Sequence, residues 1–157
     1  MSRAASCSRS GKLRTGDSRL HSRRNVTIRI VRLGSERAPG EGLRIGTVRR
    51  PPRGVPKADF ARRNFYDVWL PNLAPSEGLL RSAQTAASSG DARAWRQFVR
   101  RYRMEMKTPD NRALLDTLAA LSHQADFAVG CYCAEESFCH RSVLRALLAD
   151  RGAAIEE

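Results

Sequence analysis

The sequence lacks an uninterrupted apolar run of the roughly 18 to 20 residues that cross a bilayer, because arginine interrupts every apolar stretch. It also lacks the apolar core, about 7 to 15 residues long, of a secretory signal. Cysteine is scarce: three of the four cysteines lie within nine residues of one another, unlike the dispersed pairs of a small secreted domain. We therefore predict a soluble, cytoplasmic protein with no membrane partner.

Lysine is nearly absent: only three of the 28 basic residues are lysines. The net charge of +12 is unevenly distributed along the 157 residues. Residues 1–25 hold seven basic groups against Asp17, which gives +6, and the other 132 residues hold 21 basic and 15 acidic groups, also +6. The first segment has too little apolar surface to order itself, so we predict a disordered basic tail. A transit peptide, a nucleic-acid-binding arm and an upstream start codon all explain such a tail.

Periodicity from residue 26 onward predicts one α/β domain. Alternating apolar residues predict strands near residues 26–31 and 43–47, and an apolar run over 126–133 predicts a strand buried on both faces. Helical spacing predicts helices near 76–88, 91–106, 110–121 and 139–151, whereas 49–74 reads as irregular. We expect a small, partly parallel sheet flanked by helices over residues 26–152, with 153–157 as a C-terminal extension.

The strongest functional signal lies between the last strand and the last helix, from Cys131 to Ser142. Ligands of open α/β sheets bind beyond the carboxyl ends of the strands, and a helix start there favours an anion. We predict Cys139 as a reactive thiol, with Glu135 or His140 as the group that transfers a proton. Because Cys139 and His140 are neighbours in sequence, we do not expect them to face each other.

Arginines follow the second predicted strand at positions 49, 50 and 53. If that strand runs parallel to the last one, Arg49 and Arg53 converge with Arg141 on a phosphate or carboxylate; otherwise they form a solvated basic loop. The further expected pocket residues are Cys133, Trp69 and Tyr102. For Trp69, a place in the core is the alternative. A small anionic ligand is the predicted partner, and whether chemistry follows binding is left open.

Zinc is an alternative, because Cys131, Cys133, Cys139 and His140 match a zinc ligand set in type. The single residue between Cys131 and Cys133 differs from the usual spacing of two in zinc knuckles, so no metal or other cofactor is required by the sequence. A phosphate loop with five residues between cysteine and arginine is absent, because Cys139 occupies the position where arginine would stand. Another alternative is a non-catalytic nucleic-acid-binding or regulatory module that uses residues 1–25 and the arginine-rich helix 91–106.

Five short segments, taken in order, carry a further signal. They are Val26–Arg32, Pro52–Val55, Trp69 with Leu73–Ser76, Phe98 with Tyr102 and Glu105, and Cys133 with Cys139-His140-Arg141. Over residues 26–152 they resemble the bacterial family of domain of unknown function 488 (DUF488), in a branch that keeps the Cys-His-Arg ending. The better-known branch has Asp-Arg-Leu-Trp before Pro-Arg-Gly, whereas this chain has Val48-Arg49-Arg50-Pro51. The resemblance implies a small cytoplasmic α/β domain and no established activity.

Overall fold

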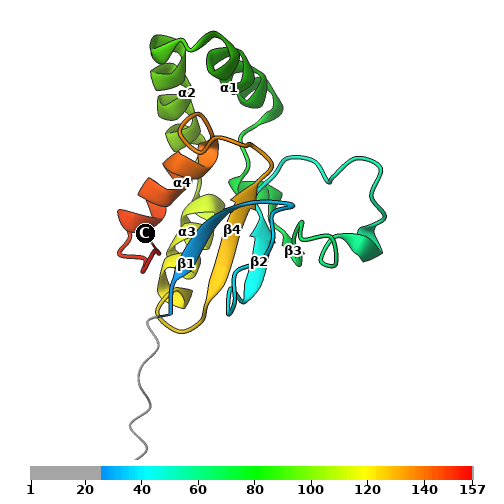
Figure 1. Cartoon of the computed structure of the whole chain (residues 1–157). Helices are drawn as coiled ribbons and strands as arrows, with labels where there is room; N and C mark the ends of the chain where they lie inside the picture. The colour runs from blue at the N-terminus through cyan, green and yellow to red at the C-terminus, as the bar shows by residue number, and fades with distance from the viewer. Residues whose placement is uncertain (1–25, 157) are drawn as a thin grey trace, which may run out of the picture.

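The computed structural model describes residues 26–156, so the predicted tail over 1–25 lies outside the described residues. A parallel sheet forms the centre of the domain, in the order β1-β4-β2-β3 (Figure 1). Its strands are β1 (Ile28–Arg32), β2 (Leu43–Gly46), β3 (Val68–Trp69) and β4 (Phe127–Cys131). The single α/β domain is confirmed, and every strand pair is parallel. The short strand β3 corrects the prediction of an irregular stretch there.

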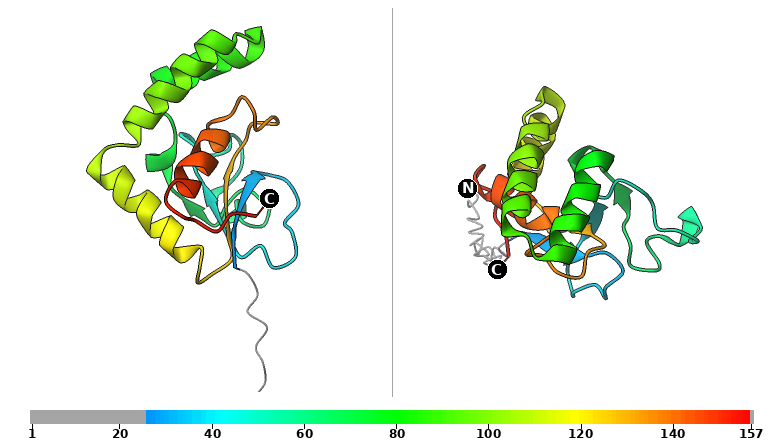
Figure 2. Two further views of the ribbon diagram at one scale, coloured as in Figure 1. Left: turned by 90° about the vertical axis from the view of Figure 1, so that its left-hand side faces the viewer. Right: turned by 90° about the horizontal axis from the view of Figure 1, so that it is seen from above.

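Local sequence explains where the helices begin and end. The helices are α1 (Glu77–Ser89), α2 (Ala92–Glu105), α3 (Pro109–Leu121) and α4 (His140–Ala149). Gly90 ends α1 with a left-handed φ of 65°, and the Asp91 carboxylate then accepts hydrogen bonds from the amides of Arg93 and Ala94 to start α2. The pair α1 and α2 runs side by side and projects beyond the sheet (Figure 2).

The core lies between the sheet and helices α3 and α4. Ile28 of β1 and Val129 of β4 are fully buried there against Leu115 of α3 and Leu144 of α4. All five residues of β4 are buried, as expected for a central strand with a neighbour on each side. The carboxyl end of this buried strand therefore fixes the position of the cysteine-rich loop that follows it.

The segment expected as a C-terminal extension pairs with the outer edge of β1. The amide of Ile28 donates to the carbonyl of Ala154 at 2.8 Å, and the amide of Glu156 donates to the carbonyl of Ile28 at 2.9 Å. Residues 153–156 thus belong to the folded unit, because their backbone hydrogen bonds cover part of the exposed edge of the sheet.

Loops cover the face of the sheet opposite α3 and α4, and a buried ion pair holds them. The Arg44 guanidinium, fully buried, donates from Nε and Nη2 to the Glu41 carboxylate at 2.6 and 2.7 Å. Its Nη1 donates to the backbone carbonyls of Ser35 and Asn64 at 2.9 and 2.7 Å. The Arg44 side chain therefore joins β2 to the loop that contains Ser35 and to the loop that contains Asn64, which are distant from each other in sequence.

Two glycines in the loop before β2 provide a matched test of its packing. Both have a left-handed φ, 72° at Gly40 and 74° at Gly42, but a Cβ at Gly40 would meet open space, whereas one at Gly42 would overlap the carbonyl oxygen of Asp126. We expect Gly40→Ala to lower the free energy of unfolding by about 1 kcal/mol through φ alone. Gly42→Ala should cost at least about 2 kcal/mol more, because the backbone must move. Urea denaturation followed by circular dichroism measures both, and equal losses would contradict the overlap.

Candidate thiol site

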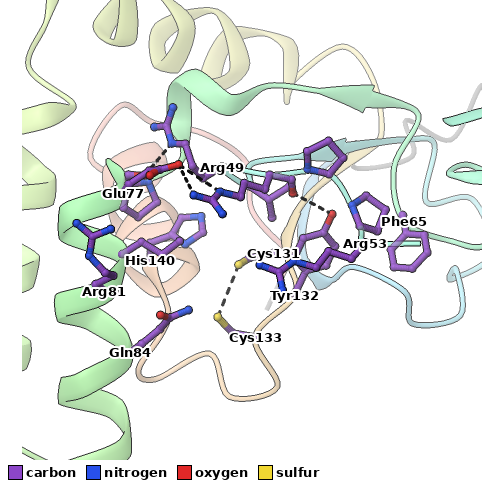
Figure 3. Close-up of a pocket in the computed structure, with 16 residues that line it drawn as sticks. Arg49, Arg53, Phe65, Glu77, Arg81, Gln84, Cys131, Tyr132, Cys133 and His140 are labelled. Atoms are coloured by element: carbon purple, nitrogen blue, oxygen red, sulfur yellow. Dashed lines mark hydrogen bonds and ion pairs between the residues drawn. The ribbon is translucent and has the colours of Figure 1, made fainter. Parts of the chain in front are cut away.

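The candidate site lies where the carboxyl ends of β2 and β4 meet the start of α4. The chain leaves β4 at Cys131, turns through residues 132–138 and enters α4 after Cys139, whose sulfur accepts a hydrogen bond from the amide of Arg141 at 3.5 Å. A cavity of about 680 Å³ opens between this edge and α1 (Figure 3). Its polar and sulfur-bearing walls include Arg49, Arg50, Arg53, Glu77, Arg81, Gln84, Cys131, Cys133 and His140.

Three cysteine sulfurs lie close together at this edge of the sheet, and two of these cysteines, Cys131 and Cys133, line the cavity. The Sγ atoms of Cys131, Cys133 and Cys139 lie within 4.8 Å of one another, and those of Cys131 and Cys133 are 3.7 Å apart. Cys131 and Cys139 are buried, whereas Cys133 is exposed. Of the three thiols, only Cys133 combines solvent exposure with a place in the cavity wall.

The surroundings of Cys133 favour its thiolate form. The pKa of Cys133 is lowered because the Cys131 and Cys139 thiols donate hydrogen bonds to its sulfur and because the Arg141 cation lies nearby. The pKa of Cys131 is raised, since its proton is held between the two neighbouring sulfurs and its thiol is buried. The pKa of Cys139 is lowered too, because the Cys131 thiol also donates a hydrogen bond to its sulfur and His140 lies beside it. The cluster thus favours a thiolate on two sulfurs, of which only that of Cys133 is exposed to solvent and to a ligand.

His140 is oriented by a backbone carbonyl. Its Nε2 lies 2.8 Å from the carbonyl oxygen of Thr47, which can only accept, so Nε2 carries the ring proton. In the neutral ring Nδ1 then has a free lone pair, and it lies 3.8 Å from the Cys139 sulfur. This contact corrects the expectation that Cys139 and His140 do not face each other. Cys139 precedes the helix in an extended conformation (φ −123°, ψ 145°), so the geometry of helix neighbours does not apply to it.

Arg141 stabilises the loop and does not line the cavity. Its side chain is buried, and Nη2 donates to the carbonyl oxygen of Cys133 at 2.8 Å. Its Nε is buried with no hydrogen-bond partner in the described part of the chain. Arg141, predicted as an anion-binding residue, thus lies behind the Cys133 loop and outside the cavity lining. Glu135 is exposed on that loop and lies outside the cavity lining.

The parallel pairing of β2 and β4 brings Arg49 and Arg53 to the cavity that contains Cys133. Arg49 is partly occupied: Nε donates to the carbonyl of Pro75 at 3.0 Å and Nη2 to that of Ala74 at 2.7 Å. Arg53 and Arg81 of α1 make no side-chain hydrogen bond or ion pair within residues 26–156, so their guanidinium groups remain available to a ligand.

Two predicted pocket residues lie elsewhere. Trp69 is 42 % exposed on β3, with Nε1 donating to the carbonyl of Val48 at 2.8 Å, so it lies outside both the cavity lining and the buried core. Tyr102 is fully buried in the core, where its hydroxyl donates to the carbonyl of Leu73 at 2.6 Å. Its ring meets the His140 ring edge-on, with centroids 5.7 Å apart, so it supports the site from behind.

Sequence reasoning missed the wall that α1 contributes. Arg81 and Gln84 lie three residues apart on this helix, and both line the cavity (Figure 3). Nothing in the local pattern of α1 indicates that it lies over the carboxyl edge of the sheet. Phe65 and Tyr132, whose rings meet edge-on at 6.0 Å between centroids, add an aromatic wall that was also not predicted.

The fold and the site together define a class: a parallel α/β domain with a thiol cluster at the carboxyl edge of its central strand. The three sulfur atoms could hold a metal ion. A family model described as the active DUF488-N3 subclade matches residues 28–152, and the chain belongs to the DUF488 family. A search of curated proteins found no match, and a search of solved structures found none. In the described range no helix is long and apolar enough to cross a membrane.

Proposed function

We propose that this protein is a thiol-dependent enzyme that holds a small anionic substrate beside Cys133. The proposal rests on one observation: Cys133 is the exposed member of the sulfur cluster and shares a cavity wall with several arginines. In this role Cys133 replaces the originally predicted Cys139, which is 1 % exposed. The description of the matched subclade as active agrees with an enzymatic role.

Each residue of the cavity has a distinct part in this proposal. Cys133 is the nucleophile, because a thiolate and not a thiol attacks an electrophile. Arg53 and Arg81 hold the phosphate or carboxylate of the substrate through charge-assisted hydrogen bonds. Cys131 and Arg141 are positioning residues that keep the charge on the Cys133 sulfur. Reduced thiols of this kind require a reducing compartment, which supports the prediction of the cytoplasm.

The pH dependence of alkylation tests the nucleophile. We expect iodoacetamide to label Cys133 at nearly the same rate at pH 8 and pH 6, because its lowered pKa keeps it ionised throughout. The alkylation rate of an ordinary thiol, with a pKa of about 8.5, falls roughly a hundredfold from pH 8 to pH 6, because its thiolate fraction falls by that factor. Mass spectrometry of the labelled peptides separates Cys133 from the other cysteines. A rate that falls as it does in an ordinary thiol would remove the activated-thiol part of the proposal.

Competition by inorganic phosphate tests the anion site. Phosphate should slow the alkylation of Cys133, and Arg53→Gln combined with Arg81→Gln should abolish that protection at the same ionic strength. Arg62→Gln is the matched control, because this exposed arginine pairs with Asp59 and lies outside the cavity lining. Equal protection in wild type and in the double variant would contradict anion binding by these arginines.

A metal site is a second candidate function for the same cluster, and one distance favours it. The 3.7 Å between the sulfurs of Cys131 and Cys133 matches the edge of about 3.8 Å that zinc–sulfur bonds of about 2.3 Å give in a tetrahedron. Nδ1 of His140 lies 3.8 Å from the Cys139 sulfur, so this ring nitrogen faces the cluster as a fourth ligand atom. Metal analysis of protein purified without chelator distinguishes the candidates. A stoichiometry near one, with alkylation only after chelation, would support the metal site, and a value near zero would exclude it.

A further inference from the structure

Helix α2 carries a row of arginines that the thiol site does not use. The helix contains five arginines and one glutamate. Arg93, Arg96 and Arg100 lie three and four residues apart, so at 100° per residue they share one face, which we call the α2 arginine row. All three are exposed, and the buried residues Phe98 and Tyr102 lie on the opposite side of the helix.

The row has no partner in the described molecule. Across residues 26–156, the side chains of Arg93, Arg96 and Arg100 make no ion pair and no hydrogen bond, whereas Arg103 of the same helix pairs with Asp150 at 3.3 Å. Like charges three and four residues apart repel each other and destabilise a helix. The row therefore opposes folding, and no contact within this range compensates for it.

The position of α2 makes the row accessible. The helix packs on α1 and α4 through its apolar side, where Trp95 stacks on Phe98 with ring centroids 4.8 Å apart. Together with α1 it projects beyond the sheet (Figures 1 and 2). A projecting helix with cations on its free side is a convex surface, unlike the cavity beside Cys133, and it suits an extended polyanion better than a small ion.

We propose that the α2 arginine row binds the phosphate backbone of a nucleic acid without reading its sequence. The three guanidinium groups extend over about 10 Å of helix axis, which is the axial length of about three phosphates of one strand. An anionic membrane is the poorer fit, because α2 turns its aromatic residues inward and exposes only Met104, at 62 %, as a large apolar side chain. The inference is independent of the thiol chemistry.

Fluorescence anisotropy with a labelled DNA duplex of about 20 base pairs tests the row in the full-length chain. Arg93→Gln, Arg96→Gln and Arg100→Gln are combined in one variant. Removing three phosphate contacts should weaken binding at least tenfold near 0.1 M salt. It should also lower the magnitude of the slope of the logarithm of the binding constant against the logarithm of the salt concentration by about 2.7, because each contact contributes about 0.9. The matched control removes three exposed arginines elsewhere, Arg32, Arg62 and Arg112, and should keep most of the slope.

Two further measurements separate this role from others. The unfolding temperature of the row variant should equal or exceed that of wild type, because like-charge repulsion has been relieved; a structural role for the row would lower it. Vesicles containing anionic lipid should bind more weakly than the duplex at equal salt. The proposal is overturned if wild type does not bind the duplex, if the row variant and the control have equal slopes, or if the vesicles bind more tightly.

Discussion

Replacing Cys131 by alanine is expected to raise at least tenfold the ratio of the alkylation rate of Cys133 at pH 8.5 to that at pH 5.5. In wild type the Cys131 thiol, whose sulfur lies 3.7 Å away, donates to the Cys133 sulfur and is the main cause of its lowered pKa. Without that donor the pKa of Cys133 moves back toward the ordinary value of about 8.5, so the thiolate fraction varies strongly across the interval. A ratio of rates is the suitable readout, because the intrinsic nucleophilicity of a thiolate also changes with its pKa.

Serine at position 131 is the matched control. A hydroxyl is a good hydrogen-bond donor of similar size, so Cys131→Ser should keep the flat pH profile of wild type. Parallel profiles for the alanine and serine variants would show that hydrogen bonding from this position does not set the ionisation of Cys133. Unfolding curves of both variants confirm that the domain remains folded during labelling.

Replacing Arg44 by methionine is expected to lower the free energy of unfolding by about 3 to 5 kcal/mol. The change leaves the buried Glu41 carboxylate without its bidentate partner and removes the donor for the carbonyls of Ser35 and Asn64. Arg37→Met is the control. Arg37 pairs with Asp67 at 2.9 Å nearer the surface, so this substitution should lower the free energy of unfolding by about 1 kcal/mol or less. Urea denaturation measures both losses, and similar values would contradict the importance of burial.

The penalty of the Arg44 variant should also depend on pH. Burial alone would raise the pKa of Glu41, but the hydrogen bonds from Arg44 and the amide of Ala38 lower it overall. In wild type the carboxylate therefore contributes stability above its unfolded pKa of about 4.3, and that contribution is lost as pH falls through the lower folded pKa. In the variant, burial dominates and favours the protonated acid. The difference in unfolding free energy between wild type and variant should thus be smaller at pH 4 than at pH 7.

Sequence reasoning located the site because its central residues are contiguous. Cys131 to Arg141 connect a buried strand to a helix, and the convergence of parallel strand ends added Arg49 and Arg53. It did not identify which sulfur faces solvent, because that depends on how residues 132–138 turn. It also missed Arg81, since the placement of α1 depends on tertiary packing.

Burial on β2 shows the same limit in the fold. Alternation predicted Leu43, Ile45 and Thr47 as the residues that mark this strand, yet Leu43 is 47 % exposed and Arg44 is fully buried. An arginine is stable there only because the Glu41 carboxylate and two loop carbonyls surround its guanidinium. Those partners come from loops whose course the periodicity of β2 does not specify.

The position of β4 between β1 and β2 also determines the order in which the domain can assemble during synthesis. Ile28 of β1 pairs with Phe127 of β4 and with Ile155, so its strand has no partner until 99 further residues have been translated. At about 5 to 20 residues per second this takes roughly 5 to 20 seconds. Such non-local pairing gives the domain a high contact order and slow folding. The thiols of Cys131 and Cys139 therefore become buried only once β4 and α4 have packed with the elements translated before them, and until that step they are exposed in the incompletely folded chain.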